Sequence, residues 1–193
     1  MSVAIIIPTY NEAENIETLL VEIIGLGLKK AKVLVVDDNS PDGTGKIVEK
    51  LKRKHKDKIH VIHRQGKLGL GSAYKEGFEK ALGQNPKTIV TMDADFSHNP
   101  SVIPKMLEKL KDSDVVVGSR HIKGGKIVGF NSARHLLSKG AQFLCMKIGG
   151  LRVYDSTSAF RAYRANVLSK INPETIKGEG YSFLIELIFA CQK

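Results

Sequence analysis

Short apolar runs alternate along the chain with longer segments in which apolar residues recur at helical spacing. The runs rich in Val and Ile predict strands at 3–7, 32–36, 59–62, 88–92 and 114–118. The segments between them predict helices near 13–24, 44–55, 71–82 and 100–110. Nearly continuous apolar strands separated by helices are typical of a mostly parallel sheet covered on both faces. The sequence therefore predicts an α/β, Rossmann-like fold, in which ligands bind beyond the carboxyl ends of the strands.

The pattern changes after Gly118. Glycines at 124, 125 and 129 indicate a loop, and apolar residues then recur at helical spacing over 133–148 among several basic residues. This segment is either an ordinary core helix or a helix that lies against anionic lipid. The stretch VYDSTSAFRAYR at 153–164 predicts a turn, and a last helical pattern runs from Tyr181 to the end of the sequence.

The ends of four predicted strands carry the polar chemistry. They read PTYNE, DDNSPDG, DADFSH and GSRHIKGG, so carboxylates, turn residues and an arginine converge on one edge of the sheet. The first strand is not followed by G-x-G-x-x-G, so the dinucleotide-binding fingerprint is absent. The sequence also lacks G-x-S-x-G and Walker A motifs, which leaves acyl transfer and P-loop ATP hydrolysis without support.

Two aspartates, Asp93 and Asp95, follow the fourth strand at positions i and i+2. In an extended chain these side chains share a face, and two carboxylates so close repel unless a cation or strong donors lie between them. Asp95 or Ser97 could instead cap the helix that begins at Pro100, but capping leaves Asp93 without a role. Mg²⁺ would explain both carboxylates, because it binds carboxylate and phosphate oxygens and keeps several waters.

The other candidates each have a plain structural alternative. Asp37 and Asp38 belong to a turn, yet because they are adjacent we expect at least one to face the ligand crevice. Arg120, just beyond the fifth strand, is either a surface residue or a phosphate ligand. The glycines of GKLGLG suit either an anion site or simple loop chemistry, and His98 is interpreted as loop surface rather than a metal ligand.

Size and charge narrow the class of protein. The chain has 193 residues, 42% of them hydrophobic, which suits a single domain, and it has neither a run of about 18 apolar residues nor a signal peptide. Its net charge of +10 favours a polyanionic partner: nucleic acid, an anionic membrane or a phosphorylated small molecule. The basic stretch 46–58 is interpreted as the solvated face of a helix, since no aromatic residue interrupts it. Cys145 and Cys191 lie in apolar contexts and are expected to be reduced in a cytosolic protein.

Taken in order, five segments resemble family 2 glycosyltransferases of the GT-A fold, and more closely the polyprenyl (dolichyl) phosphate mannosyltransferases: IIIPTYNEAENI, VLVVDDNSPDGT, TMDADFSHNP, VVGSR and DSTSAFRAY followed by GEGYSF. The resemblance covers almost the whole chain. It implies a single catalytic domain over 1–193, with a nucleotide-sugar half at about 1–120 and an acceptor half at about 121–193. It also implies a basic loop of the type R-x-x-G-x-S-K after the last helix, which this sequence does not include.

The resemblance assigns a role to each matching residue. Pro8, Tyr10 and Glu12 would line the nucleotide pocket, with Val36 and Asp38 at its base. Asp93, Ala94 and Asp95 would hold the donor diphosphate. Arg120 would contact a phosphate of the donor. Asp93, Asp95 and Arg120 form the expected catalytic set, with Asp95 as the main metal ligand. Ser97 stands where some relatives have a glutamine as second metal ligand. Arg134 and Ser138 would contact the phosphate of the acceptor.

The implied reaction is an inverting transfer of mannose from GDP-mannose to dolichyl or polyprenyl phosphate, dependent on Mg²⁺ or Mn²⁺, that releases GDP. The composition agrees, because a polyprenyl phosphate is already an anion and needs cationic guidance more than a strong base. We expect a protein at the cytoplasmic face of a membrane, bound peripherally to anionic lipid, with no nucleic-acid partner. The alternative within enzymes is transfer from a UDP-sugar such as UDP-glucose to a polyprenyl phosphate or to a glycan. A nucleotide- or RNA-binding module is the alternative outside enzymes, and the ordered carboxylates at the strand ends count against it.

Overall fold

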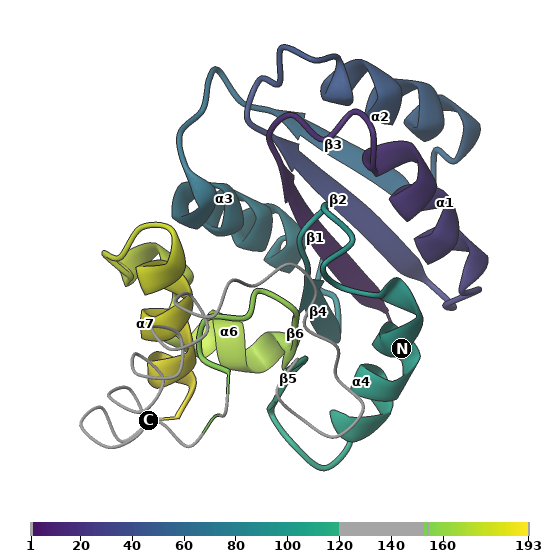
Figure 1. Ribbon diagram of the computed structural model, residues 1–193. Coiled ribbons are helices and arrows are strands. Elements are labelled where there is room, and N and C mark those ends of the chain that lie inside the picture. The colour runs from purple at the N-terminus through teal and green to yellow at the C-terminus, as the bar shows by residue number, and fades with distance from the viewer. Residues whose placement is uncertain (1, 120–152, 154, 193) are drawn as a thin grey trace, which may run out of the picture.

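The computed structural model describes residues 2–119, 153 and 155–192 of the chain (Figure 1). Within these residues, six strands form one sheet in the order β3-β2-β1-β4-β6-β5. Their bounds are β1 Val3–Thr9, β2 Ala31–Asp37, β3 Ile59–His63, β4 Thr88–Thr91, β5 Val115–Val117 and β6 Arg161–Arg164. The five strands predicted from the apolar runs are all present, with ends shifted by one or two residues.

The sheet is mostly parallel, which confirms the predicted fold class. Strand β1 pairs in parallel with β2 and β4, and β2 pairs in parallel with β3. Strand β6 is antiparallel to both of its neighbours, β4 and β5. The prediction of a turn for 153–164 is therefore wrong at its end, because Arg161–Arg164 forms strand β6, which lies between β4 and β5.

Helices connect the strands at nearly the predicted positions (Figure 1). They are α1 Ile16–Gly25, α2 Thr44–Lys54, α3 Leu70–Leu82, α4 Ile103–Lys109, α6 Ala165–Ile171 and α7 Tyr181–Cys191. The predicted helix at 13–24 begins only at Ile16, because the amides of Asn15 and Ile16 both donate to the Glu12 carbonyl in a preceding turn. The predicted helix at 100–110 is divided into a 3₁₀ turn, η1 Pro100–Val102, and α4.

Each face of the sheet is covered by its own hydrophobic core. Alternate residues of β1 point to opposite faces. Ile5 and Ile7 belong to the core that the sheet forms with α1, α2 and α4, whereas Ile6 belongs to the core that it forms with α3, α6 and α7. Helix α2 buries Val48 and Leu51 against the first core and exposes its lysines, so the solvated-face interpretation of 46–58 is confirmed. Helices on both faces thus bury the sheet and leave its carboxyl edge to bind ligands.

Strand order locates the crevice at that edge. From β1 the chain moves outward through β2 to β3 and then returns to β4 on the other side of β1. In open α/β sheets, ligands bind where the strand order reverses in this way, here between the carboxyl ends of β1 and β4. None of the helices in the described part of the chain has the length and the apolar character needed to cross a membrane.

Candidate functional site

The loops that follow β1 and β2 are fastened to each other by side chains that the sequence places at the strand ends. Asp37 is buried and accepts hydrogen bonds from the hydroxyls of Thr9, at 3.0 Å, and Ser40, at 2.6 Å. Ser40 Oγ in turn accepts from the amide of Asn11 at 3.0 Å. Strand β1, its loop and the loop after β2 therefore form one connected rim at the carboxyl edge.

A second set of bonds extends this rim to the start of α2. Thr44 Oγ1 accepts from the amide of Glu12 at 2.9 Å, and it donates to Asp42 Oδ1 at 2.6 Å. The other oxygen of Asp42 accepts from the amide of Ala13 at 2.9 Å. The NSPDGT stretch thus acts as a turn, as its composition predicts, and it fixes the backbone of the first loop.

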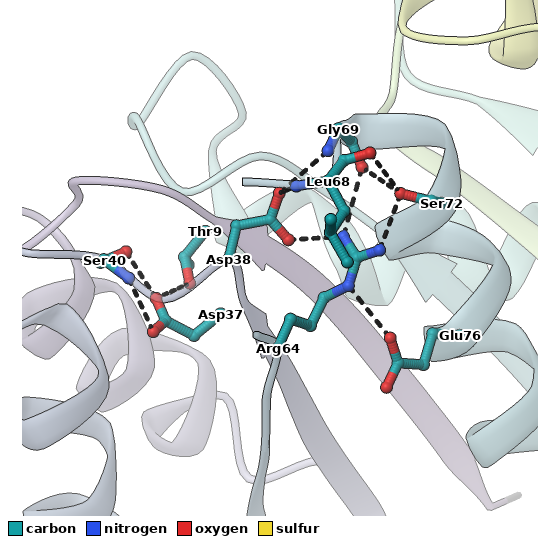
Figure 2. Close-up of polar contacts among 9 residues, drawn as sticks. All are labelled: Thr9, Asp37, Asp38, Ser40, Arg64, Leu68, Gly69, Ser72 and Glu76. Atoms are coloured by element: carbon teal, nitrogen blue, oxygen red, sulfur yellow. Dashed lines mark hydrogen bonds and ion pairs between the residues drawn. The ribbon is translucent and has the colours of Figure 1, made fainter. Parts of the chain in front are cut away.

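Asp38 closes the loop between β3 and α3 from inside the protein (Figure 2). Its Oδ2 accepts from the amides of Leu68 and Gly69 at 3.0 and 3.1 Å, and its Oδ1 accepts from Arg64 Nη1. Gly69 has a φ of +96°, a conformation that L side chains rarely adopt, so glycine is required to present that amide. The loop interpretation of these glycines is thereby supported by a specific contact.

Arg64 is the centre of this network. Its side chain is only 5% exposed, yet it donates through Nη2 to Ser72 Oγ at 2.7 Å and lies with Nε 3.0 Å from Glu76 Oε2. The Glu76 contact is an ion pair whose direction does not meet that of a hydrogen bond. Arg64 therefore joins the end of β2, its own loop and the first turns of α3 in one buried cluster (Figure 2).

The expectation that Asp37 or Asp38 would face the crevice is not what the structure shows. Both side chains are buried, at 2% and 5% exposed, and both are occupied by donors of the protein itself. They order the loops of the carboxyl edge. Direct contact of Asp38 with a nucleotide stays a prediction, and it would have to use a lone pair that the network leaves available.

Other residues predicted for the nucleotide pocket lie at different depths. Tyr10 is 36% exposed and carries Lys67 Nζ 4.1 Å from the centre of its ring, a cation–π contact. Pro8 and Glu12 are half-buried on either side of it. Val36, in contrast, is fully buried in the core under α3, so only its backbone could contact a ligand. Tyr10 and Lys67 thus form part of the exposed surface of this rim.

The D-x-D motif does not continue the strand. Strand β4 ends at Thr91, and residues 94–98 form a bend, with a φ of +56° at Phe96. Asp95 is exposed in this bend and accepts from the amide of Ser97 at 2.9 Å. The expectation of two carboxylates on one face of an extended chain is therefore wrong, because the chain turns between them.

Neither capping alternative holds. The side chain of Asn99 accepts from the amide of Ser101 and caps η1, so the cap is supplied by neither Asp95 nor Ser97. The interpretation of His98 as loop surface is also wrong. Its ring is only 4% exposed and stacks on Phe160 with 5.1 Å between ring centroids. Capping therefore no longer competes for the role of the two aspartates.

Asp93 lies deeper than Asp95, between two ring systems. Tyr74, from α3, donates its hydroxyl to Asp93 Oδ1 at 3.5 Å, and His98 Nδ1 lies 3.7 Å from Asp93 Oδ2. Burial, together with the negative charge of Asp93, raises the pKa of Tyr74 well above its ordinary value, so this hydroxyl stays protonated and can donate. Asp93 is thus held in place by the protein, whereas Asp95 faces solvent.

The residues at this bend fit a divalent cation that takes most of its ligands from elsewhere. Within the described residues, no group of three or more His, Cys, Asp and Glu side chains is placed to hold a metal ion. Partial burial raises the pKa of Asp95, but the hydrogen bonds from Ser97 outweigh it, so the pKa is below its usual value and the carboxylate is charged at neutral pH. An exposed carboxylate beside the Ser97 hydroxyl suits Mg²⁺ or Mn²⁺, whose remaining positions go to water and substrate phosphate.

Three of the predicted site residues cannot be placed. Arg120, Arg134 and Ser138 lie outside the described residues, together with the predicted loop at 124–129 and the predicted helix at 133–148. Their roles stay predictions. The described part of the site therefore comprises the rim of β1 to β3 and the bend after β4.

The chain matches a known family along most of its length. The profile described as "Glycosyl transferase family 2" matches residues 4–171. The chain belongs to this family. The resemblance seen in the five sequence segments is thereby confirmed.

Relatives in sequence share most of this chain. The polyprenol monophosphomannose synthase of Mycolicibacterium smegmatis is 40% identical over 184 residues, which are 95% of this chain and 69% of that protein. The undecaprenyl-phosphate mannosyltransferase of Micrococcus luteus is 39% identical over 98% of this chain and 77% of its own length. The dolichol-phosphate mannosyltransferase of Pyrococcus furiosus is 40% identical, and the chain spans only 52% of it.

Solved structures agree on the fold of this glycosyltransferase. Glucosyl-3-phosphoglycerate synthase of Mycobacterium tuberculosis, in complex with Mn²⁺ and UDP, gives a TM-score of 0.66 at 15% identity, over 97% of this chain and 63% of that one. The mannosyltransferase PcManGT of Pyrobaculum calidifontis, in complex with GDP-Man and Mn²⁺, gives 0.62 at 20% identity, over 96% and 51%. At these identities the likeness shows the fold alone. The α/β fold with its mostly parallel sheet is thus shared with these two proteins.

Sequence reasoning missed Arg64, Lys67 and Tyr74 as residues of the site region. A signal was present for the first two, since Arg64 directly follows β3, whose carboxyl end lies at the same edge as those of β1 and β2. Tyr74 gave no such signal, because it lies inside α3 and reaches Asp93 only through the packing of that helix on the sheet.

Proposed function

We propose that this chain transfers mannose from GDP-mannose to a polyprenyl phosphate such as dolichyl phosphate. The observation that carries the proposal is an identity of about 40% over at least 95% of the chain to three proteins named for mannose transfer onto polyprenyl carriers. The site agrees in chemistry, because it offers an ordered rim for a nucleotide and an ionised carboxylate for a diphosphate-bound cation. The chain spans 69%, 77% and 52% of the lengths of these three relatives.

In this proposal the donor lies across the crevice between β1 and β4. The nucleoside contacts the rim at Pro8, Tyr10 and Glu12, with Lys67 near the ring of Tyr10. The diphosphate lies at the bend of Asp93, Ala94 and Asp95. Asp95 and Ser97 would hold Mg²⁺ or Mn²⁺, which supplies positive charge to the departing diphosphate. Arg120 is proposed as a further phosphate ligand.

The reaction is a single displacement with inversion. An oxygen of the polyprenyl phosphate forms a bond to the anomeric carbon of mannose, while the bond from that carbon to the β-phosphate oxygen breaks and its electron pair leaves on GDP. The acceptor oxygen is already anionic, so no strong general base is required. The protein's task is to orient the two phosphates and to stabilise the charge that develops on GDP. Arg134 and Ser138 are proposed to orient the acceptor.

The test is the affinity for the donor, measured by calorimetry in one buffer with Mn²⁺ and in another with EDTA. GDP-mannose should bind tightly with Mn²⁺ and weakly with EDTA, because Asp95 would hold the cation and the cation would supply positive charge to the diphosphate. Asp95→Asn should lose most of this difference and keep its melting temperature. Asp57→Asn is the matched control, since Asp57 is an exposed aspartate that precedes β3 at the opposite edge of the sheet.

Comparison of GDP-mannose with UDP-glucose as ligands decides which of the two is the donor. UDP-glucose should bind more weakly than GDP-mannose under the same conditions, and radiolabelled mannose should pass from GDP-mannose into the lipid phase when polyprenyl phosphate is supplied. Equal affinity of GDP-mannose with Mn²⁺ and with EDTA would remove the metal assignment. Preference for UDP-glucose would replace the donor.

A further inference from the structure

His98 is a buried aromatic residue directly beside the donor site, and no role for it follows from the proposed chemistry. It is 4% exposed, and its ring stacks on Phe160 at an interplanar angle of 20°. Phe160 is itself 4% exposed and belongs to the core between the sheet and α1. The ring of His98 is thus anchored to the rigid part of the fold, although its backbone belongs to the bend after β4.

A hydrogen bond joins this anchored ring to the start of the bend. The backbone amide of Asp93 donates to His98 Nδ1 at 3.0 Å. Nδ1 can accept only when it carries no hydrogen, which places the hydrogen of the neutral ring on Nε2. The bond closes the segment 93–98 into a loop, with Asp93 and His98 at its base.

Asp95 lies at the tip of this closed loop. Its position depends on the base at Asp93 and His98 and on the local bond from the Ser97 amide to Asp95 Oδ1. Phe96, with a φ of +56°, holds the chain in a conformation that a non-glycine residue adopts only when its surroundings impose it. The contact between His98 and Phe160 joins these local bonds to the core, beside the bond from Tyr74 to Asp93.

We propose that His98 is a positioning residue of the donor site, which fixes the D-x-D bend so that Asp93 and Asp95 meet the diphosphate and its divalent cation in a preformed arrangement. This inference rests on the proposed role of the bend in donor binding. His98 itself touches neither the donor nor the cation. Its effect reaches them through the backbone of Asp93, as outer residues orient the ligands of a metal site.

Two substitutions separate the acceptor from the stacking ring. His98→Phe keeps an aromatic ring against Phe160 and removes the acceptor. His98→Asn removes the ring and keeps an amide oxygen close to the place of Nδ1. Asn99→Ala is the control for general damage to the bend, because it removes the cap of η1 at the next residue and leaves the Asp93 bond untouched.

The measurement is the dissociation constant of GDP with Mn²⁺ and with EDTA, by calorimetry, beside the melting temperature of each variant. We expect His98→Phe to weaken Mn²⁺-dependent GDP binding by about 10- to 100-fold, as substitution of outer residues does at metal sites. Its affinity in EDTA should stay near that of the wild type. His98→Asn keeps an acceptor for the Asp93 amide but loses the anchor on Phe160, so it should recover only part of the Mn²⁺-dependent affinity. Asn99→Ala should lower the melting temperature without a change in affinity.

The outcomes distinguish this inference from the proposed function. A wild-type protein that binds GDP equally with Mn²⁺ and with EDTA overturns the metal assignment and this inference together. A wild type with metal-linked binding, and a His98→Phe variant that keeps it, overturn only the positioning role. Equal loss in both buffers would reduce His98 to a structural residue. If His98→Phe does not fold, His98→Gln takes its place, because its longer side chain moves the acceptor away from the Asp93 amide and predicts the same loss.

Discussion

Two buried arginines show how single residues shape this site. Arg161 is fully buried and donates to the backbone carbonyls of Ser156, Ser158 and Leu184 at 2.6 to 2.7 Å. Arg64 is satisfied mainly by side chains, above all by the buried carboxylate of Asp38. A buried cation held by carbonyls leaves no charge behind when it is replaced, whereas one held by a buried carboxylate does. Loss of Arg64 would therefore leave the buried charge of Asp38 unpaired, whereas loss of Arg161 would leave only neutral carbonyls without a donor.

Replacement of Arg64 by Met should destabilise the protein by about 3–5 kcal/mol, because the charge of Asp38 would remain buried without its cation. Arg64→Lys should recover only part of this, since an ammonium cannot reproduce the fork that spans Asp38 and Ser72. The free energy of unfolding in urea measures the effect.

Glu76→Gln is the control for the same guanidinium. The Glu76 side chain is 42% exposed, so its ion pair with Arg64 should contribute no more than about 1 kcal/mol. Similar losses in Arg64→Met and Glu76→Gln would show that the Asp38 pair is not the dominant contact.

At this scale the sequence predicted which residue types gather at the carboxyl edge, and not which of them face a ligand. Asp38 and Arg64 are separated by 26 residues, and their pairing depends on β2 and β3 lying side by side. His98 looks like a loop residue because Ser97 and Asn99 beside it are polar, and in the structure it is buried and stacks on the distant Phe160. Contacts of this kind come from packing, which periodicity does not report.

Among the elements, the strands with continuous apolar runs were predictable and β6 was not. Strand β6 reads RAYR, and two arginines in four residues suggest a surface turn. In the structure the guanidinium of Arg161 is satisfied by carbonyls inside the protein, so the buried strand tolerates it. The sequence pattern gives polarity, whereas burial depends on partners from α7 and from the loop before β6.

Helix α3 lies unusually close to the sheet at Gly77. A Cβ at this position would lie 2.6 Å from Ile6 Cγ2, and Ile6 is fully buried in β1 and cannot move aside. Gly77→Ala should therefore destabilise the protein, because overpacking costs about 1–3 kcal/mol and outweighs the gain of about 1 kcal/mol in helix propensity. Urea unfolding measures the difference.

Gly83→Ala provides the comparison on the same helix. Gly83 follows the last residue of α3 in a right-handed conformation, and its nearest neighbour would be a carbonyl oxygen 3.6 Å from the new Cβ. We expect little change in stability for this variant. A Gly77→Ala protein as stable as Gly83→Ala would mean that α3 can shift on β1 at little cost.

At the scale of the whole molecule, the net charge is the property that can be read most directly from the sequence. The net charge of +10 suits the anionic donor and acceptor of the proposed reaction, and it also suits an anionic membrane that holds the acceptor. A single domain with a donor half and an acceptor half stays a prediction, since much of 121–193 lies outside the described residues. Most lysines of α2 are exposed, on a helix that packs against β3, and in the sheet β3 lies on the side of β1 opposite to β4.

We expect the protein to bind vesicles that contain anionic lipid and to release them as salt rises, because exposed charges are screened beyond about 8–10 Å at 0.1–0.15 M. If the basic segment 133–148 lies against lipid, charge reversal there should weaken binding more than the same reversal on α2. The pair of variants is Arg134→Glu, Lys139→Glu and Lys147→Glu in one protein, and Lys46→Glu, Lys50→Glu and Lys54→Glu in the other. Flotation with anionic and with neutral vesicles measures both. Both variants change the net charge by the same amount and differ only in where that charge lies, so equal loss in the two would assign binding to net charge alone. Equal binding of the wild type to anionic and to neutral vesicles would remove the electrostatic explanation.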